Sequence, residues 1–193
     1  MNLSTIATAR YAVHQLTGID NPAVVEQVLA EKDARRGTDP GDTNYEDTPL
    51  PDTSEVRAIT GRVAEIMRDI DPRLAPSPFW SHILNPGEST MFHTHSVGSY
   101  PGIGLSWVYY ASVPERSGHL VFICQINDER IFHRVTPAVG RLVVFPASMP
   151  HMTERHAGQG VRVSISGNYF LSSETTLAVL SGKTRTKVRE FAG

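Results

Sequence analysis

A run of short, closely spaced β-type segments between residues 79 and 170 constrains the fold more than any other feature. Each segment is rich in aromatic and β-branched residues, and Gly, Pro, Ser or Asn separates it from the next. Such spacing is typical of antiparallel strands in a sandwich or barrel. The predicted strands cover residues 79–85, 89–95, 106–112, 119–125, 130–136, 141–145 and 161–170.

The N-terminal part of the chain lacks this pattern and is predicted to be helical. Residues 2–17 form a first helix candidate, which Gly18 would close. A second helix is expected after Asn21, because Asn is a favoured N-cap residue and Pro22 suits the first helical position. Gly37 is the expected end of this helix.

A third helix is predicted to start near Asp52–Ser54, and Asp71-Pro72 would end it. Between the second and third helices, residues 37–54 are rich in acids and prolines and poor in aliphatic side chains. This composition predicts either a plain linker or a lid over a site. The apolar residues of the third helix recur at helical spacing, so they are expected to pack on the sheet: Val56, Ile59, Val63, Ile66, Met67 and Ile70.

Composition narrows the classes of protein. The formal net charge is −2, which disfavours a general nucleic-acid binder. A single cysteine, Cys124, excludes an internal disulfide and a multi-cysteine zinc site, so a bound metal would need His, Asp or Glu ligands. No apolar run approaches the roughly 20 residues of a membrane helix, and the N-terminus has no signal-peptide pattern. A cytoplasmic protein that binds neither membranes nor nucleic acids is therefore expected.

The histidines are concentrated in the predicted β region. Seven of the eight lie between His82 and His156, and metal binding is a common reason for such an excess. His93 and His95 are two residues apart at the end of a predicted strand, so both side chains point to the same face. His151 follows after 55 residues, just beyond another predicted strand.

Ten residues separate the third of these histidines from Arg162-Val163-Ser164, in which Arg162 and Ser164 share a strand face. Three ligands on one face of an octahedral ion leave three positions open for a co-substrate and dioxygen. Arg162 could then pair with a carboxylate at the far end of that co-substrate. The Ser164 hydroxyl could donate to the same carboxylate.

The pattern H-x-H, a long gap, H, ten residues, R-x-S resembles the signature of the Fe(II)/2-oxoglutarate-dependent oxygenases, in which H-x-D/E opens the series. The surrounding sequence is similar to a bacterial 2OG-Fe(II) oxygenase family with an H-T-H sequence and a strand containing Tyr-Tyr. The similar runs are WSHILNPGESTMFHTHSVGSY, LSWVYYASVP and GRLVVFPASMPHMTERHAGQGVRVSISGNY. Together they cover about half of the chain, residues 79–170.

This resemblance implies a mainly β fold, the double-stranded β-helix, which is a jelly-roll barrel of the cupin type with the metal inside one mouth. Residues 78–172 would form this catalytic core. Residues 1–77 would be a helical extension that packs on the barrel, and residues 173–193 a C-terminal tail. The segments 37–54 and 96–105 are candidates to close over a substrate.

The resemblance also implies an activity, in which a small organic substrate is hydroxylated with dioxygen and 2-oxoglutarate, and succinate and CO2 are released. Fe(II) would be held by His93, His95 and His151. The co-substrate 2-oxoglutarate would be anchored by Arg162 with Ser164.

One position departs from the superfamily pattern, because His95 stands where most members have a carboxylate. A neutral imidazole leaves the ion one unit more positive, which should tighten binding of an anionic co-substrate. Three arrangements remain open. His95 could be the third ligand, it could stand aside, or an acid such as Glu154 or Asp128 could complete the site.

A cupin pattern fits the same residues in part. Gly87 lies six residues before His93, as in the first cupin motif, although the acid that usually follows is missing. Gly140, Pro146 and His151 nearly match the second motif. The alternatives to the first reading are therefore a three-histidine iron dioxygenase that does not use 2-oxoglutarate, and a metal-binding barrel without catalysis.

The sequence offers two further candidates for the site, Tyr109 and His82. Trp107 and Tyr109 share one face of a predicted strand, and Tyr109 is proposed to bind the co-substrate, because a buried hydroxyl needs a partner. His82 alternates with apolar residues and could line the cavity. Exposed strand edges make a homodimer plausible. The residues assigned structural roles are His14, His119, His133, His156 and Cys124.

Overall fold

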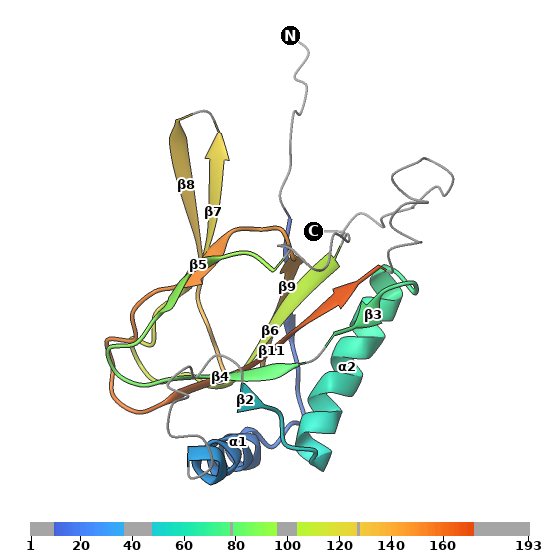
Figure 1. The fold of residues 1–193 in the computed structure, drawn as a ribbon, viewed down its shortest axis with the longest axis vertical. Coiled ribbons are helices and arrows are strands. Elements are labelled where there is room, and N and C mark those ends of the chain that lie inside the picture. The colour runs from blue at the N-terminus through green and yellow to red at the C-terminus, as the bar shows by residue number, and fades with distance from the viewer. Residues whose placement is uncertain (1–9, 37–47, 78, 96–103, 127, 172–193) are drawn as a thin grey trace.

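Two antiparallel sheets and two helices make up the computed structural model, which describes residues 10–36, 48–77, 79–95, 104–126 and 128–171 (Figure 1). The larger sheet has the strand order β1 (Ala12–Gln15), β9 (Arg141–Pro146), β6 (Gly104–Ser112), β11 (Arg162–Phe170), β4 (Trp80–Leu84) and β2 (Thr48–Pro49), with β3 (Ala75–Pro76) also paired to β11. The smaller sheet has the order β5 (Thr90–His93), β10 (His151–Thr153), β7 (Leu120–Ile126) and β8 (Glu129–Val135).

The core is divided between the two faces of the larger sheet. One cluster lies between this sheet and the helices and includes Trp107, Tyr109 and Ile165. The other lies between the two sheets and includes Tyr110 and Phe122. This division follows from strand geometry, because successive side chains of β6 and β11 point to opposite faces. The same alternation decides which side chains of these strands can reach a site between the sheets.

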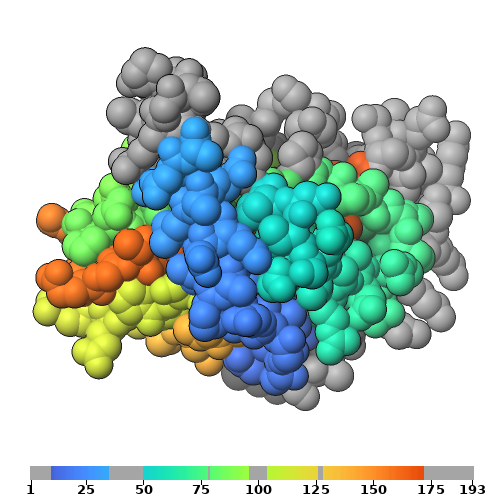
Figure 2. Space-filling view, turned by 90° about the horizontal axis from the view of Figure 1, so that it is seen from below, coloured from blue at the N-terminus to red at the C-terminus, as the bar shows by residue number. Residues whose placement is uncertain are grey.

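Helix α1 (Asn21–Arg36) and helix α2 (Ser54–Ile70) cover the outer face of the larger sheet. Figure 2 shows the two helices beside each other on this side of the molecule. Thr53 is the N-cap of α2, where its side chain accepts a hydrogen bond from the backbone N–H of Val56. The start and end predicted for this helix are confirmed. So is its apolar stripe, since Val56, Ile59, Val63 and Met67 are buried.

The N-terminus of α1 differs slightly from the prediction. The carboxylate of Asp20, rather than the side chain of Asn21, accepts a hydrogen bond from the backbone N–H of Ala23, at 3.1 Å. Asp20 therefore supplies the side-chain cap, one residue earlier than expected. Asn21 is free to serve another purpose, and its side chain contacts the larger sheet through Tyr109.

The helix predicted for residues 2–17 is wrong where the structure describes it. Ala12–Gln15 is a strand, β1, which pairs antiparallel with β9 and places Val13 opposite Val143. The backbone N–H of Leu16 then donates to the carbonyl of Gly140 at 2.8 Å. Backbone hydrogen bonds to β9, which sequence periodicity does not reveal, outweigh a moderate helix propensity here. The N-terminal region thus contributes strands to the larger sheet as well as helices.

The predicted strands between residues 79 and 170 correspond to β4 to β9 and β11. The short strand β10 was not predicted, since His151 was expected just after a strand. The predicted tail and the main parts of both candidate closing segments, residues 37–47 and 96–103, lie outside the described residues. Neither helix among the described residues has the length and apolar character needed to cross a membrane.

Candidate metal centre and adjoining pocket

Three histidines from distant parts of the chain meet between the two sheets. His93 ends β5, His95 follows it by two residues, and His151 begins β10. The pairing of β10 with β5 places His151 directly opposite His93. One nitrogen from each of the three rings lies within 4.8 Å of the others. The structure therefore brings together the three histidines predicted from the sequence.

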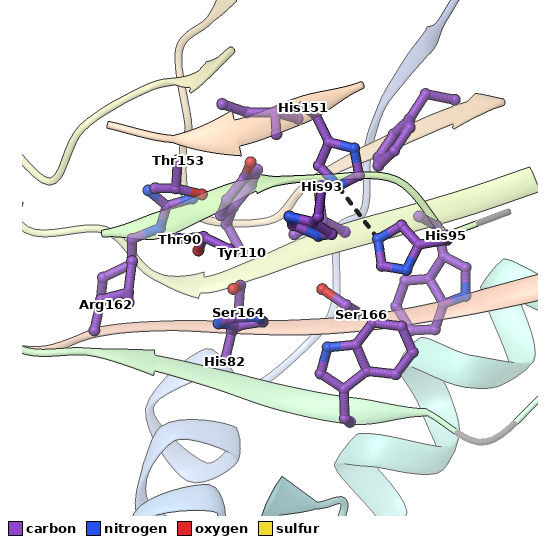
Figure 3. A pocket seen from close by; sticks show the side chains of 16 residues that line it. His82, Thr90, His93, His95, Tyr110, His151, Thr153, Arg162, Ser164 and Ser166 are labelled. Atoms are coloured by element: carbon purple, nitrogen blue, oxygen red, sulfur yellow. Dashed lines mark hydrogen bonds between the residues drawn. The ribbon is translucent and has the colours of Figure 1, made fainter. Parts of the chain in front are cut away.

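The ring nitrogens are arranged as metal ligands require. The Nε2 atoms of His95 and His151 are 3.2 Å apart, which Figure 3 marks with a dashed line. Two ligands at about 2.1 Å from one ion, at right angles, would be about 3.0 Å apart. Nδ1 of His93 is 2.7 Å from the carbonyl of Met91, and Nδ1 of His151 is 2.8 Å from that of Met149. Since each Nδ1–H donates to a carbonyl, the Nε2 lone pair is left for a metal.

Burial keeps two of these imidazoles neutral. It lowers the pKa of His95 to about 3, with further lowering from the charges of His151, His93 and His82. It also lowers the pKa of His151 to about 4, while the hydrogen bond to Met149 opposes the shift. A histidine must be neutral to bind a metal, so both rings are in the competent form near pH 7.

The structure narrows the alternatives for the third ligand. The Glu154 carboxylate is already bound, with Oε2 at 2.7 Å from Nδ1 of His119 and Oε1 at 2.7 Å from Nε of Arg134. Asp128 is exposed at the turn between β7 and β8. Neither acid lines the pocket, and the metal-ligand cluster found among the described residues contains histidines alone.

The pocket beside the cluster has a floor made by β4 and β11 (Figure 3). These strands pair with Leu84 opposite Arg162, His82 opposite Ser164 and Trp80 opposite Ser166. Directly opposite residues of an antiparallel pair point to the same face, so all six side chains line the pocket. The other lining residues are Thr90, His93, His95, Trp107, Val108, Tyr110, Leu120, Phe145, His151 and Thr153. None of the described residues that line the pocket carries a carboxylate.

Arg162 lies at one end of the pocket and is almost fully buried, with 2% of its surface exposed. Its Nη1 donates to the carbonyls of Ser117 and Gly118 at 3.1 and 3.2 Å. Its Nε has no hydrogen-bond partner within the described structure, although the atom is buried. A buried guanidinium without a carboxylate is costly, so the pocket is suited to an anion.

Tyr110, not Tyr109, faces this guanidinium. The Cζ atom of Arg162 is 5.0 Å from the centroid of the Tyr110 ring. The Tyr110 hydroxyl is buried and lacks a hydrogen-bond partner among the residues described. Burial raises the pKa of this hydroxyl, and the positive charge of Arg162 opposes the shift.

The proposed role of Tyr109 in the site is therefore wrong. Tyr109 points from β6 toward the helices, and its hydroxyl donates to Oδ1 of Asn21 at 2.7 Å. The two adjacent tyrosines have the same chemistry, and only the packing of α1 decides which face of β6 is covered by helices. The prediction that one face of this strand is core and the other lines the site is correct, but the faces were exchanged.

The remaining histidines are placed as follows. His82 lines the pocket, as the sequence left open. His119, His133, His14 and His156 are not among the lining residues. His119 is bound to Glu154, and the ring of His133 is 2.7 Å from the hydroxyl of Tyr11.

Comparisons with solved structures support this architecture, whereas no protein-family model and no curated protein matches the sequence. A prolyl hydroxylase from Trichoplax adhaerens, solved with a hypoxia inducible factor peptide, is 14% identical with a TM-score of 0.63, over 87% of this chain and 86% of the other. A Pseudomonas putida prolyl-4-hydroxylase is 20% identical with a TM-score of 0.53, over 86% and 88%. SnoK, a non-heme alpha ketoglutarate dependent carbocyclase from nogalamycin biosynthesis, is 12% identical with a TM-score of 0.59, over 84% and 79%.

These neighbours are double-stranded β-helix oxygenases, and the likeness establishes the fold of this chain as a double-stranded β-helix. The fold class predicted from the sequence is thereby confirmed. At such low identity the likeness carries the fold only, and the chemistry of the site has to be argued from the residues that line it.

Proposed function

We propose that this protein is an Fe(II)- and 2-oxoglutarate-dependent oxygenase that hydroxylates a small organic substrate. The observation that carries the proposal is the pairing of two sites in one pocket. A cluster of three imidazoles lies beside a buried guanidinium whose Nε is unpartnered in the described structure. The sequence pattern and the oxygenases with the same fold support this assignment.

His93, His95 and His151 would hold the iron. Their neutral nitrogens form one face of donors, so an octahedral ion would keep positions for a chelating co-substrate and dioxygen. Because no ligand is charged, the ion would keep its full double positive charge and attract an anionic co-substrate strongly. Iron and 2-oxoglutarate would supply the oxidation, in which one oxygen atom of dioxygen enters succinate and the other enters the substrate.

Arg162, Ser164 and Tyr110 would hold the distal carboxylate of 2-oxoglutarate. Charge-assisted hydrogen bonds to a carboxylate would satisfy both the Arg162 Nε and the Tyr110 hydroxyl, which are buried and unpartnered within the described structure. The Ser164 hydroxyl lies on the same strand face as Arg162. The fit between these donors and a dicarboxylic keto acid is the main reason to prefer 2-oxoglutarate over a co-substrate without a second carboxylate.

The described residues would also exclude water from the reacting end of the pocket. Trp80 and Phe145 supply aromatic surface there, and the Trp80 ring lies 5.6 Å from that of His95. Apolar walls of this kind strengthen the electrostatic attraction between the ion and its ligands.

The proposal is tested by anaerobic titration of the Fe(II)-loaded protein with 2-oxoglutarate, followed by an assay for succinate when air is admitted. A weak visible charge-transfer band is expected on binding, and substrate-stimulated succinate formation is expected in air. Iron binding without this band would favour a three-histidine dioxygenase that does not use 2-oxoglutarate, or a barrel without catalysis. Size-exclusion chromatography would test the homodimer predicted from the strand edges.

A further inference from the structure

We propose that His82 is a fourth donor of the carboxylate subsite, where its imidazole N–H binds the distal carboxylate of 2-oxoglutarate together with Arg162, Ser164 and Tyr110. This inference rests on the proposed function and adds a residue that lies outside the H-x-H, H and R-x-S pattern. It is carried by the position of His82 in the pocket and by the hydrogen bonding of its ring.

The position of His82 follows from strand pairing. His82 on β4 is directly opposite Ser164 on β11, and both side chains line the pocket. Arg162 is the next residue of β11 on the same face. Figure 3 shows His82 beside Ser164, between Arg162 at one end of the pocket and the rings of His93 and His95 at the other. A dicarboxylic acid that joins the metal to Arg162 has to pass this ring.

The ring of His82 is partly buried and has no hydrogen bond to another side chain or to the backbone in the described part of the chain. His156 shows what a structural histidine in this fold looks like. His156 is fully buried, its Nε2 is 3.0 Å from the carbonyl of Gly160, and its Nδ1 accepts from the backbone N–H of Gly158 at 3.3 Å. His82 differs from His156, because its partly buried ring opens into the pocket without a protein partner in the described structure, so a bound ligand can reach its N–H.

The chemistry of the neighbours decides which ligand group His82 contacts. Arg162, Ser164 and Tyr110 all offer donors to a carboxylate, and burial together with the positive charge of Arg162 lowers the pKa of His82, so its ring is neutral. A neutral imidazole offers one N–H donor. A carboxylate has about four acceptor positions, so it can accept from the ring without losing its bonds to the guanidinium and the phenol.

The test compares two keto acids in the anaerobic titration of the Fe(II)-loaded protein. These are 2-oxoglutarate and 2-oxovalerate, which carries a methyl group in place of the distal carboxylate. In His82→Leu, the Kd for 2-oxoglutarate is expected to rise about 10-fold or more, whereas the Kd for 2-oxovalerate changes by less than about 3-fold. If His82 had only a structural role, His82→Leu would raise the Kd values for both keto acids by the same factor. That result would overturn the inference.

Three controls complete the design. His156→Gln should lower the thermal stability but leave the ratio of the two Kd values unchanged. His82→Gln and His82→Asn place an amide N–H near the Nε2 and Nδ1 positions, so one of them should restore the preference for 2-oxoglutarate. These two variants also decide the question if His82→Leu does not fold. If both His82→Gln and His82→Asn keep the wild-type preference for 2-oxoglutarate over 2-oxovalerate, the role of His82 is refuted. Wild-type protein that binds no 2-oxoglutarate would overturn the proposed function and this inference together.

Discussion

The Nε2 atoms of His95 and His151 lie 3.2 Å apart, although 56 positions separate the two residues along the chain. The pairing of β10 with β5 brings them together. Two imidazoles at this distance, both kept neutral by burial, are held in place before a metal arrives. A preorganised site of this kind loses little conformational entropy on metal binding.

His151→Ala is expected to weaken Fe(II) binding at least about 100-fold, because it removes one of three ligands and a ring that is already oriented by the Met149 carbonyl. His95→Asp should retain binding, since an aspartate can replace the imidazole as ligand. Metal content after dialysis and competition with a coloured chelator would measure both effects. His119→Ala, outside the pocket, is the control; equal loss in this variant would contradict a site made of the three clustered histidines.

The adjacent tyrosines provide a matched pair of variants. Tyr110→Phe removes a hydroxyl that is buried and unpartnered in the described structure, so it should raise the Kd for 2-oxoglutarate about 10-fold with little loss of stability. Tyr109→Phe removes the hydrogen bond to Asn21 and should lower the free energy of unfolding by about 1 kcal/mol. Its affinity for 2-oxoglutarate should be unchanged. Calorimetric titration measures the affinity, and urea unfolding measures the stability. An affinity loss in Tyr109→Phe together with a stability loss in Tyr110→Phe would refute the orientation of β6.

Arg162→Lys keeps the positive charge but cannot reproduce the planar set of donors that binds a carboxylate and the carbonyls of Ser117 and Gly118. We expect binding of 2-oxoglutarate to weaken at least about 10-fold while Fe(II) binding is retained. Measurements of iron content report Fe(II) binding, and the charge-transfer band reports 2-oxoglutarate binding, so the two effects can be separated. An Arg162→Lys protein that turns over 2-oxoglutarate like the wild type would argue against the carboxylate subsite.

The stability of the metal-free protein should fall as the pH is lowered. Burial lowers the pKa of His82 to about 4, of His95 to about 3 and of His151 to about 4, from an ordinary value of 6.5. Below pH 6.5 the unfolded chain takes up protons at these residues, whereas the folded protein does not until the pH approaches 4. The free energy of unfolding should therefore be constant above about pH 7 and lower by about 1 kcal/mol or more at pH 5.

This pH dependence is measured by urea unfolding in the presence of a chelator, at several values between pH 8 and pH 5. A metal-free protein with the same stability at pH 7 and pH 5 would mean that these histidines are not buried in the folded state.

Part of the site could be predicted because short-range geometry alone decides it. In H-x-H and R-x-S the two side chains are two residues apart, and the pleat of a strand places them on one face whatever the rest of the fold does. Arg162 and Ser164 were therefore identified correctly as sharing a face of β11. The strand predicted to hold both His93 and His95 ends at His93, and His95 reaches the same cluster from two residues beyond it. The apolar stripe of α2 followed in the same way from the helical period.

Other features could not be predicted, because they depend on which partner covers a surface. Tyr109 and Tyr110 are equivalent in the sequence, and His82 could have been a core residue. Residues 12–15 have moderate helix propensity, yet they form β1 because β9 offers an open edge.

The sequence by itself determined the antiparallel β character of residues 79–170, the third helix and the residue types of a possible metal site. The tertiary structure decided which tyrosine enters the pocket, that the clustered ligands of the described residues are all histidines, and that His82 lies beside Ser164. The physical reason is the range of the interactions. Backbone periodicity acts over a few residues, whereas the burial and pairing of side chains depend on strands that are far apart in the sequence.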